Sequence, residues 1–322
     1  MNDIAQSIRE ARNIKETTLS TYMRTLKRVH EQCGHTGECT SLEFLCEHEH
    51  VLDSLPVKAT TRKNHLAACV VALSAQTAQL SDSQRALDIY RQHMVKHIKE
   101  CEEEQRKQLK SPKEKANWCS LKELRAVVHT HKQQLLAGEV FKKEPGTLSK
   151  REHHLLQRWL VGSLYIGCDG HPPLRLDYAQ MRVVTLPQFN ALTEDERGSN
   201  YLVNSSRNTK FFSLGDYKTK KTYGEKRIPC TSKLNGVLNQ YLRLHTHSHL
   251  LLNAKGEPMT ANQLTKFLHR TFEPTGKTIS CCMLRHIYIS EFMTGPSLKE
   301  RAEVSDKMAH SLSTQELYKK HD

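Results

Sequence analysis

Residues 101–118 read CEEEQRKQLKSPKEKANW, and this stretch determines how the chain is divided. It is dense in charge, is interrupted by Pro112 and contains almost nothing apolar. Such a composition is typical of a linker, because a segment without apolar side chains gains little by packing into a core. The sequence therefore predicts a charged linker at 106–117, between one domain at 1–105 and another at 118–322.

The first predicted domain is helical throughout and has no internal repeat. After a cap at Thr17 or Thr18, apolar residues recur at helical spacing and predict one buried stripe: Leu19, Tyr22, Met23, Leu26 and Val29. Three further helices are predicted, and each begins at a serine or threonine that can act as its N-cap: Thr40 with Glu43, Thr60 or Thr61, and Ser81 with Gln84.

The second predicted domain mixes strands and helices. A capping box at Ser120 and Glu123 opens its first helix, and helical periodicity returns at 152–167. Three short segments rich in β-branched and aromatic residues follow: MRVVTL (181–186), KFFSLGDY (210–217) and EKRIPC (225–230). Four segments with helical stripes come after them: 232–244, 260–272, 279–293 and 298–310. The predicted fold class is mainly α with a small antiparallel β-sheet, that is, α+β.

The charge balance points to a polyanionic partner. Lys and Arg number 48 against 35 Asp and Glu, a net charge of +13, and nucleic acid is the first candidate. The sequence has no signal-peptide pattern and no apolar run of about 18 residues, so we expect an intracellular protein without a membrane partner. The ten cysteines form no compact framework, so we expect reduced thiols and no structural disulfide.

One cluster of histidines and cysteines raises the question of zinc: His30, Cys33, His35, Cys39, Cys46, His48 and His50. The spacing lacks the paired CxxC or HxxxH units of structural zinc sites. We therefore favour ordinary polar surface and predict no metal site.

A run of basic residues lies between 206 and 233, against only Asp216 and Glu225: Arg207, Lys210, Lys218, Lys220, Lys221, Lys226, Arg227 and Lys233. Several lysines crowd the turn between two predicted strands, so a hairpin would project them toward a groove or a phosphate. A solvated charged hairpin is the alternative, but for the whole run we favour phosphate contact. The predicted DNA-binding residues are Arg207, Lys210, Lys226 and Arg227.

Two arginines stand in unusual surroundings. Arg175 in GHPPLRLDY follows Pro172 and Pro173, which fix the local backbone. Arg285 in ISCCMLRHIYIS lies in an otherwise apolar helix, at helical spacing from Cys282. Burying an arginine is costly unless it meets an anion, so Arg285 serves either a structural salt bridge or an anion site.

The last residues supply further reactive groups. Ser313 and Glu316 have capping-box spacing and predict a short helix that carries Tyr318, with His310 at the end of the preceding helix. A tyrosine hydroxyl attacks phosphorus only if the phosphate charge is neutralised and a proton donor meets the leaving oxygen. Arginine, histidine and lysine are the side-chain types that this chemistry needs.

In this order, Arg175, Lys218, Arg285, His310 and Tyr318 resemble the active-site series of the tyrosine recombinase (phage integrase-like) family. The resemblance rests on GHPPLR, YKTKKTYGEKRIP, MLRHIYIS and MAHSLSTQELY and extends over both predicted domains. It implies a helical, SAM-like core-binding domain and a catalytic domain that together clamp double-stranded DNA. It also implies that the protein forms a homotetramer when two DNA sites are brought together in synapsis.

The resemblance also implies the reaction of a site-specific recombinase or integrase. The tyrosine attacks a DNA phosphate, forms a 3′-phosphotyrosyl intermediate and releases a 5′ hydroxyl, without metal or nucleotide cofactor. Two alternatives stay open: a catalytically weakened DNA-binding remnant and a type IB topoisomerase-like DNA-relaxing enzyme. The motifs MLRHIYIS and KTKKTYG are similar to those of recombinases of large eukaryotic DNA viruses and crypton-like mobile elements. We expect the protein to lie with DNA inside the cell, in the nucleus if the host is eukaryotic.

The chain departs from the family pattern in places. Cys282 stands where the family usually has histidine, three positions before the second arginine. Lys220 and Lys221 lie close enough to Lys218 to be secondary candidates for the general acid. Only four residues follow Tyr318, too few for the helix through which many relatives assemble. We therefore expect either assembly through other surfaces or a truncated protein.

Overall fold

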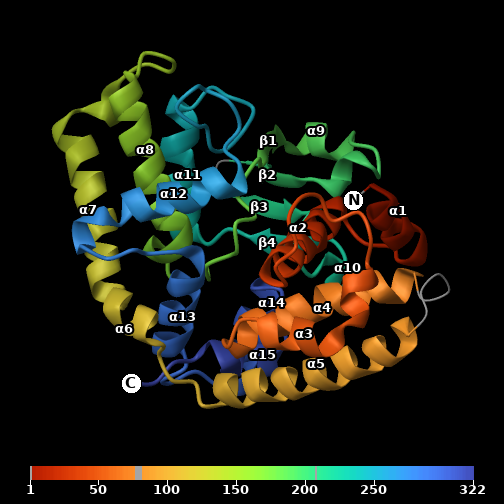
Figure 1. Ribbon diagram of the computed structural model, residues 1–322. Helices are drawn as coiled ribbons and strands as arrows, with labels where there is room; N and C mark the ends of the chain where they lie inside the picture. Colours follow the sequence, from red (N-terminus) through yellow and green to blue (C-terminus); the bar gives the residue numbers. More distant parts are fainter. Residues whose placement is uncertain (1, 77–81, 207–208) are drawn as a thin grey trace. The chain divides into compact units, whose positions relative to one another are not determined.

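The computed structural model describes residues 2–76, 82–206 and 209–322 (Figure 1). The chain forms two compact units, Met1–Lys107 and Gln108–Asp322, which are described separately below. The first unit is helical, and the second combines helices with one sheet. Among the described residues, none of the helices combines the length and the apolar composition needed to cross a membrane.

The first unit contains five helices and one 3₁₀ turn in its described residues: α1 (Asn2–Ala11), α2 (Glu16–Gln32), η1 (Glu43–Cys46), α3 (His48–Ser54), α4 (Ala59–Gln76) and α5 (Ser83–Arg106). Along α2, three members of the predicted stripe are buried, Leu19, Leu26 and Val29, and the other two, Tyr22 and Met23, pack half-buried against the same core. The predicted helix starts differ in detail. The capping box expected at Thr40 and Glu43 is replaced by η1, where the Ser41 hydroxyl accepts from the Glu43 N–H (3.2 Å).

The starts of the remaining helices also shift by a few residues. Helix α2 begins after Lys15, α4 begins at Ala59, and α5 begins at Ser83 after Asp82 in the left-handed region. The expected cap Ser81 lies outside the described residues.

The cysteines and histidines at 30–50 are held by protein contacts. The Cys33 thiol lies 3.2 Å from the Ser54 hydroxyl, and His50 Nε2 lies 3.0 Å from the Cys33 carbonyl oxygen. Within the described ranges, no three His, Cys, Asp or Glu side chains come together as a metal site. All ten cysteines are free thiols in this structure.

The second unit contains these helices: α6 (Pro112–Asn117), α7 (Leu121–Ala137), α8 (Lys150–Gly162), α9 (Leu186–Asn190), α10 (Lys220–Tyr223), α11 (Ser232–Leu244), α12 (Ala261–Thr271), α13 (Cys281–Phe292), α14 (Leu298–Lys307) and α15 (Leu312–Tyr318). Short turns join them: η3 (Val140–Lys142), η4 (Ser163–Gly167), η5 (Glu196–Gly198) and η6 (Glu273–Thr275). The predicted capping box at Ser120 and Glu123 opens α7. The segment predicted as a linker is partly helical, because Ser111 and Glu114 form a capping box that starts α6.

The sheet of the second unit is mixed, whereas the sequence predicted an antiparallel one. Its strands are β1 (Arg182–Thr185), β2 (Asn200–Asn204), β3 (Lys210–Leu214) and β4 (Lys226–Pro229), in the order β1-β2-β3-β4. Strands β2, β3 and β4 pair antiparallel, but β1 runs parallel to β2. Strand β2 was not predicted from the sequence. Helix α9 and turn η5 lie in the crossover connection that the parallel pair of β1 and β2 requires.

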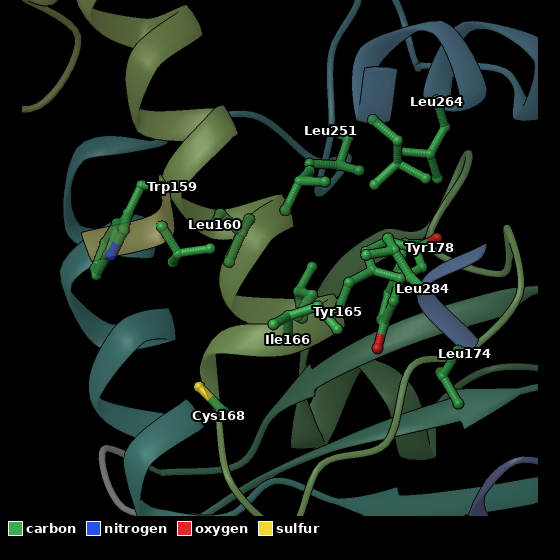
Figure 2. Packing of buried hydrophobic residues seen from close by; sticks show 14 of the residues in the cluster. Trp159, Leu160, Tyr165, Ile166, Cys168, Leu174, Tyr178, Leu251, Leu264 and Leu284 are labelled. Atoms are coloured by element: carbon green, nitrogen blue, oxygen red, sulfur yellow. The ribbon is translucent and has the colours of Figure 1, made fainter. Parts of the chain in front are cut away.

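The largest apolar core of the second unit joins several of its helices to the sheet. Buried side chains from α7, α8, α11, α12, α13 and the sheet form a single cluster. Figure 2 shows part of it, with Trp159 and Leu160 of α8, Leu264 of α12 and Leu284 of α13. Helix α8 ends in the π-helical turn η4, which carries Tyr165 into this core. The core therefore fixes α13 relative to the segment that follows η4.

Candidate active site

Arg285 is the most deeply buried charged side chain of the site, with 1% of its surface exposed. It lies on α13, and its Nη1 donates to the carbonyl of Pro173 (2.7 Å). One turn earlier, the Cys281 thiol donates to the carbonyl of Leu174 (3.4 Å). These two contacts hold the GHPPLR segment against the start of α13, so Arg175 is brought to Arg285.

Arg175 is half-buried, and its main chain is fixed on both sides. Its N–H donates to Asp177 Oδ2 (3.0 Å), and its carbonyl accepts from the Tyr165 hydroxyl (2.6 Å). Burial raises the pKa of Asp177, against the opposing effects of the Arg175 and Arg285 charges. The rigid corner expected from the two prolines is thus reinforced by two hydrogen bonds.

His310 lies in the connection between α14 and α15, three residues after the end of α14. Ala309 takes a positive φ of 52°, which turns the chain there. The Ser305 hydroxyl donates to the His310 carbonyl (2.6 Å), and the His310 N–H donates to the Ser305 carbonyl (3.2 Å). These contacts fix the backbone that presents the imidazole, which is 4% exposed.

The protonation state of His310 follows from its neighbours. Burial, followed by the charges of Arg285 and Arg175, lowers the pKa of His310 to about 3. The ring is therefore neutral near pH 7. Its Nδ1 lies 3.5 Å from Arg285 Nη2, which is a donor, so Nδ1 is the acceptor nitrogen and Nε2 carries the proton.

Tyr318 ends helix α15 and is half-buried beside both groups. The Arg285 Cζ lies over its ring at 4.9 Å from the centroid, and the His310 ring centroid lies 5.3 Å away. The helix is capped by Ser311, which accepts from the Thr314 N–H, so the predicted cap at Ser313 with Glu316 is wrong.

His286 also faces Tyr318, with ring centroids 5.2 Å apart in an edge-to-face arrangement. Its Nδ1 lies 2.8 Å from Glu114 Oε1 on α6. The same Glu114 carboxylate forms the capping box with Ser111, so α6 and α13 are connected through this histidine. Three side chains therefore contact the Tyr318 ring: Arg285, His310 and His286.

The residues after Tyr318 are held against the start of the second unit. Lys320 N–H donates to the Ser290 hydroxyl (2.9 Å), and His321 N–H donates to the Gln108 carbonyl (2.8 Å). Asp322 pairs with Lys110, with 2.6 Å between Oδ1 and Nζ. This short segment therefore fixes the end of α15 and with it the position of Tyr318.

Lys218 lies at the rim of the site, exposed, in the turn between β3 and α10. The next residue, Thr219, donates from its hydroxyl to the carbonyl of Ala309 (2.8 Å), directly before His310. The Tyr217 hydroxyl donates to the Gly224 carbonyl (2.7 Å) and closes the loop. Lys220 and Lys221 are exposed on α10, one to two residues farther along.

Two of the four predicted DNA-binding residues are buried instead. Lys210 is 3% exposed, and its ammonium donates to Asn239 Oδ1 (2.6 Å) and the Ser206 carbonyl (3.0 Å). Lys226 is 9% exposed and pairs with Asp306 on α14. Strand alternation explains this correction, because Lys226 shares a face with the buried Ile228, and Lys210 with the buried Phe212.

The other two predicted DNA-binding residues have different outcomes. Arg227 is exposed, with its Cζ 5.4 Å from the ring centroid of Phe189 and 5.3 Å from that of Phe211. Arg207 lies outside the described residues. Cys282 is an exposed free thiol at the start of α13, one turn before the buried Arg285.

Two buried N–H groups of the site have no acceptor. Arg285 Nε and His310 Nε2 make no hydrogen bond in the described part of the chain. No carboxylate of the described residues lies within 4.0 Å of the Arg285 guanidinium, so the alternative of a structural salt bridge is not realised there. Buried N–H donors without an acceptor, next to a buried positive charge, lower the stability of the fold unless a bound anion accepts their hydrogen bonds.

Several residues of the site were not identified from sequence. Asp177 stands two positions after Arg175, Thr219 follows Lys218, and Ser305 holds the turn before His310. Glu114 lay inside the predicted linker. Its SxxE spacing with Ser111 was a visible capping signal, but its contact with His286 depends on the tertiary structure.

Comparisons with known proteins gave two structural likenesses. No protein-family profile matches the chain, and no curated protein matches it. A crystal structure of XerA recombinase has a TM-score of 0.36 at 9% identity, over 99% of this chain and 94% of that chain. A structure of XerH site-specific recombinase bound to difH substrate, a pre-cleavage complex, has a TM-score of 0.37 at 12% identity, over 97% of this chain and 94% of that chain.

Proposed function

We propose that this chain is a site-specific DNA recombinase or integrase that cleaves and rejoins DNA through a 3′-phosphotyrosyl intermediate on Tyr318. The main support is the pair of unpaired buried donors, Arg285 Nε–H and His310 Nε2–H, beside that tyrosine. A phosphodiester has two non-bridging oxygens that accept such hydrogen bonds and one negative charge that offsets the arginine.

Each group has one role in this proposal. Arg175 and Arg285 neutralise the phosphate, and His310 donates from Nε2 to a non-bridging oxygen while it stays neutral. The Tyr318 oxygen forms a bond to phosphorus, and its phenolic proton leaves to solvent. The bond from phosphorus to the 5′ oxygen breaks, and Lys218 protonates that oxygen. A 5′ hydroxyl of the partner strand reverses these steps.

The free energy of the cleaved bond is retained in the phosphotyrosyl link, so rejoining needs no nucleotide cofactor. The chain itself supplies the charges that stabilise the transition state, through its two arginines and one lysine. Cys282 would present a thiol near the phosphate, where the family that this chain resembles usually has histidine.

The proposed partner is double-stranded DNA. The net charge of +13 favours it, and the exposed Arg227 with Lys220 and Lys221 extends the basic rim around Lys218. The first unit, Met1–Lys107, is proposed as the helical core-binding, DNA-binding domain, and the second as the catalytic domain. Four protomers would assemble in synapsis of two sites.

A trapping experiment tests the cleavage step. A pool of nicked duplexes with randomised cores is incubated with the full chain, because loss of the short fragment beyond the nick prevents rejoining. A covalent adduct is expected on a denaturing gel, and sequencing of the attached DNA identifies the preferred site. Tyr318→Phe should remove the adduct, whereas Tyr223→Phe, another tyrosine at the surface of the second unit, should keep it.

The outcomes separate the three functions. Salt-sensitive duplex binding without any adduct would favour a catalytically weakened DNA-binding remnant. Relaxation of supercoiled plasmid without site preference would favour a type IB topoisomerase-like enzyme. An adduct that persists in Tyr318→Phe would refute the assignment of the nucleophile.

The source of the DNA site is also part of the proposal. We place the protein with viral or mobile-element recombinases acting on DNA, in the nucleus if the host is eukaryotic. Inverted or terminal repeats flanking its coding sequence, with a core that matches the trapped DNA, would support this placement. Trapped sequences without any match to the flanks would contradict it.

A further inference from the structure

A second charged site lies in the same unit, away from Tyr318. A pocket of about 820 Å³ is formed by the start of α8, the end of α11, the loop at 246–256 and helix α12. In Figure 1 the start of α8 and this loop lie at the top of the unit, whereas α14 and α15 lie at the bottom. The pocket shares no lining residue with the candidate active site.

The lining of this pocket carries charge of only one sign. Five cationic side chains border it and no Asp or Glu does: Lys150, Arg151, Lys255, Lys266 and Arg270. Within the described residues, none of the five has a carboxylate within 4.0 Å, whereas nearby Lys143 pairs with Glu152 at 2.6 Å. Five unpaired cations around one hollow repel one another, and bound negative charge relieves this repulsion.

The walls of the pocket are held by hydrogen bonds. The Gln157 amide bridges both main-chain groups of Leu252: it accepts from the N–H (2.7 Å) and donates to the carbonyl (3.2 Å). The Asn253 side chain accepts from the Lys255 N–H (2.8 Å), and Gly256 turns the chain with a φ of +83°. The loop that carries Lys255 is therefore preorganised, which lowers the entropic cost of binding.

The pocket also offers an apolar and aromatic wall. The His154 and Phe267 rings meet edge to face with centroids 5.0 Å apart, and the lining residues Met259 and Leu252 are buried. Burial lowers the pKa of His154, as do the charges of Arg158 and Arg270. A neutral imidazole and a phenyl ring can contact a flat ring system while the cations hold phosphates.

We propose that this pocket binds a compact polyphosphate chain, carried by a nucleoside triphosphate or by inorganic polyphosphate. The size favours a small ligand, because pockets for such molecules typically hold about 300–1,000 Å³. A DNA duplex is too wide to enter a hollow of this volume and would touch only its rim. The site is independent of the proposed recombinase function, since it uses none of the groups around Tyr318.

Isothermal titration calorimetry of the whole 322-residue chain tests the proposal, at physiological salt and without divalent cations. Sodium tripolyphosphate and ATP should each bind at one site, and adenosine should not bind. The double variant Lys266→Gln/Arg270→Gln should weaken both affinities at least tenfold. The control Lys122→Gln/Lys299→Gln removes the same charge from exposed positions outside the pocket and should change them less than twofold.

Comparing the affinities for ATP and for tripolyphosphate identifies which molecule carries the phosphates. Tighter binding of ATP than of tripolyphosphate, by fivefold or more, indicates a nucleotide, and equal binding indicates the inorganic chain. Absence of saturable binding, or equal weakening in the control variant, overturns the proposal. The proposal is also overturned if Lys266→Gln/Arg270→Gln weakens the binding of duplex DNA but leaves the binding of tripolyphosphate and ATP unchanged. Since no arm measures DNA cleavage, failure here leaves the adduct experiment unaffected, and the reverse also holds.

Discussion

The guanidinium of Arg285 lies over the ring of Tyr318, with Cζ 4.9 Å from the centroid. This places a buried cation against the face of the proposed nucleophile's ring, where the negative side of the aromatic quadrupole stabilises it. The contact helps to explain how the arginine is tolerated although no carboxylate of the described residues lies within 4.0 Å of its guanidinium. It also leaves the Nε–H side of the guanidinium available for an anion.

Arg285→Met tests the cost of this arrangement. The substitution removes a buried charge and keeps a long flexible side chain, but it leaves the Pro173 carbonyl without its donor. We expect the free energy of unfolding to change by no more than about 1 kcal/mol, because the two effects oppose each other. Adduct formation should fall by about 10³-fold, as for loss of one preorganised anion-stabilising group. Urea unfolding and adduct rates measure the two effects.

The control for that substitution is Arg243→Met, which removes an exposed arginine that donates to main-chain carbonyls at Phe141 and Lys143. It should leave adduct formation unchanged. Loss of more than about 3 kcal/mol of stability in Arg285→Met would show that Arg285 is a structural residue, a loss typical of a broken buried pair.

His310 predicts a specific pH dependence of stability. Its pKa is about 3 in the folded protein, and that of an unfolded-chain histidine is about 6.5. Between these values the unfolded chain binds a proton that the folded protein does not, so stability falls as the pH falls below about 6.5. His310→Gln should reduce this slope by at most about 1.4 kcal/mol per pH unit.

Urea unfolding between pH 4 and pH 8 measures that slope. The buried His171 and His245, whose pKa values burial lowers to about 3 and about 4, contribute equally to wild type and variant and cancel in the difference. His129→Gln, at an exposed position, should follow the wild type. Identical slopes in wild type and His310→Gln would contradict a neutral, buried His310.

Part of this site could be predicted from sequence for identifiable reasons. The apolar periodicity at 279–293 predicted a helix, and α13 is found at Cys281–Phe292 with Arg285 buried among its apolar residues. The orientation of Lys226 could have been predicted too, since Ile228 lies two residues away on the same strand face. That alternation was outweighed by the number of lysines in the segment, and charge alone does not determine which face of a strand is buried.

Other features depended on tertiary contacts. Ser311 and Ser313 both have capping potential, and the turn at Ala309, with its φ of 52°, determines that Ser311 precedes α15. The contact of Glu114 with His286 joins residues far apart in the chain, which no local pattern specifies. The parallel pairing of β1 with β2 likewise depends on how α9 and η5 return the chain.

Lys218 is predicted to protonate the leaving 5′ oxygen. Lys218→Ala should slow adduct formation on ordinary DNA by about 10²–10⁴-fold, the usual contribution of a general acid. On DNA with sulfur in place of the bridging 5′ oxygen, the loss should shrink to less than about 10-fold, because a thiolate, with a thiol pKa near 8.5, leaves without a proton. Quenched adduct assays on both substrates provide the comparison.

Lys220→Ala and Lys221→Ala are the matched controls, since both lysines are exposed on α10 beside the same turn. Each should behave like the wild type on both substrates. If one of them, and not Lys218→Ala, is rescued by the sulfur substrate, the general acid is that lysine instead.

Thr219 is predicted to position Lys218 through its hydrogen bond to the Ala309 carbonyl (2.8 Å). Thr219→Val keeps the shape but removes the donor, so the turn loses its attachment to the segment that carries His310. We expect a loss of about 1 kcal/mol in stability and about 10-fold or more in adduct formation on ordinary DNA, since small displacements of a catalytic group are costly. Thr219→Ser keeps the hydroxyl and should retain most of the activity, and Thr222→Val, exposed on α10, should be neutral.

A positioning role for Thr219 further requires that Thr219→Val be partly rescued by the sulfur substrate, as is expected for Lys218→Ala. Equal losses on both substrates would show that Thr219 acts on the fold of the site and not through Lys218.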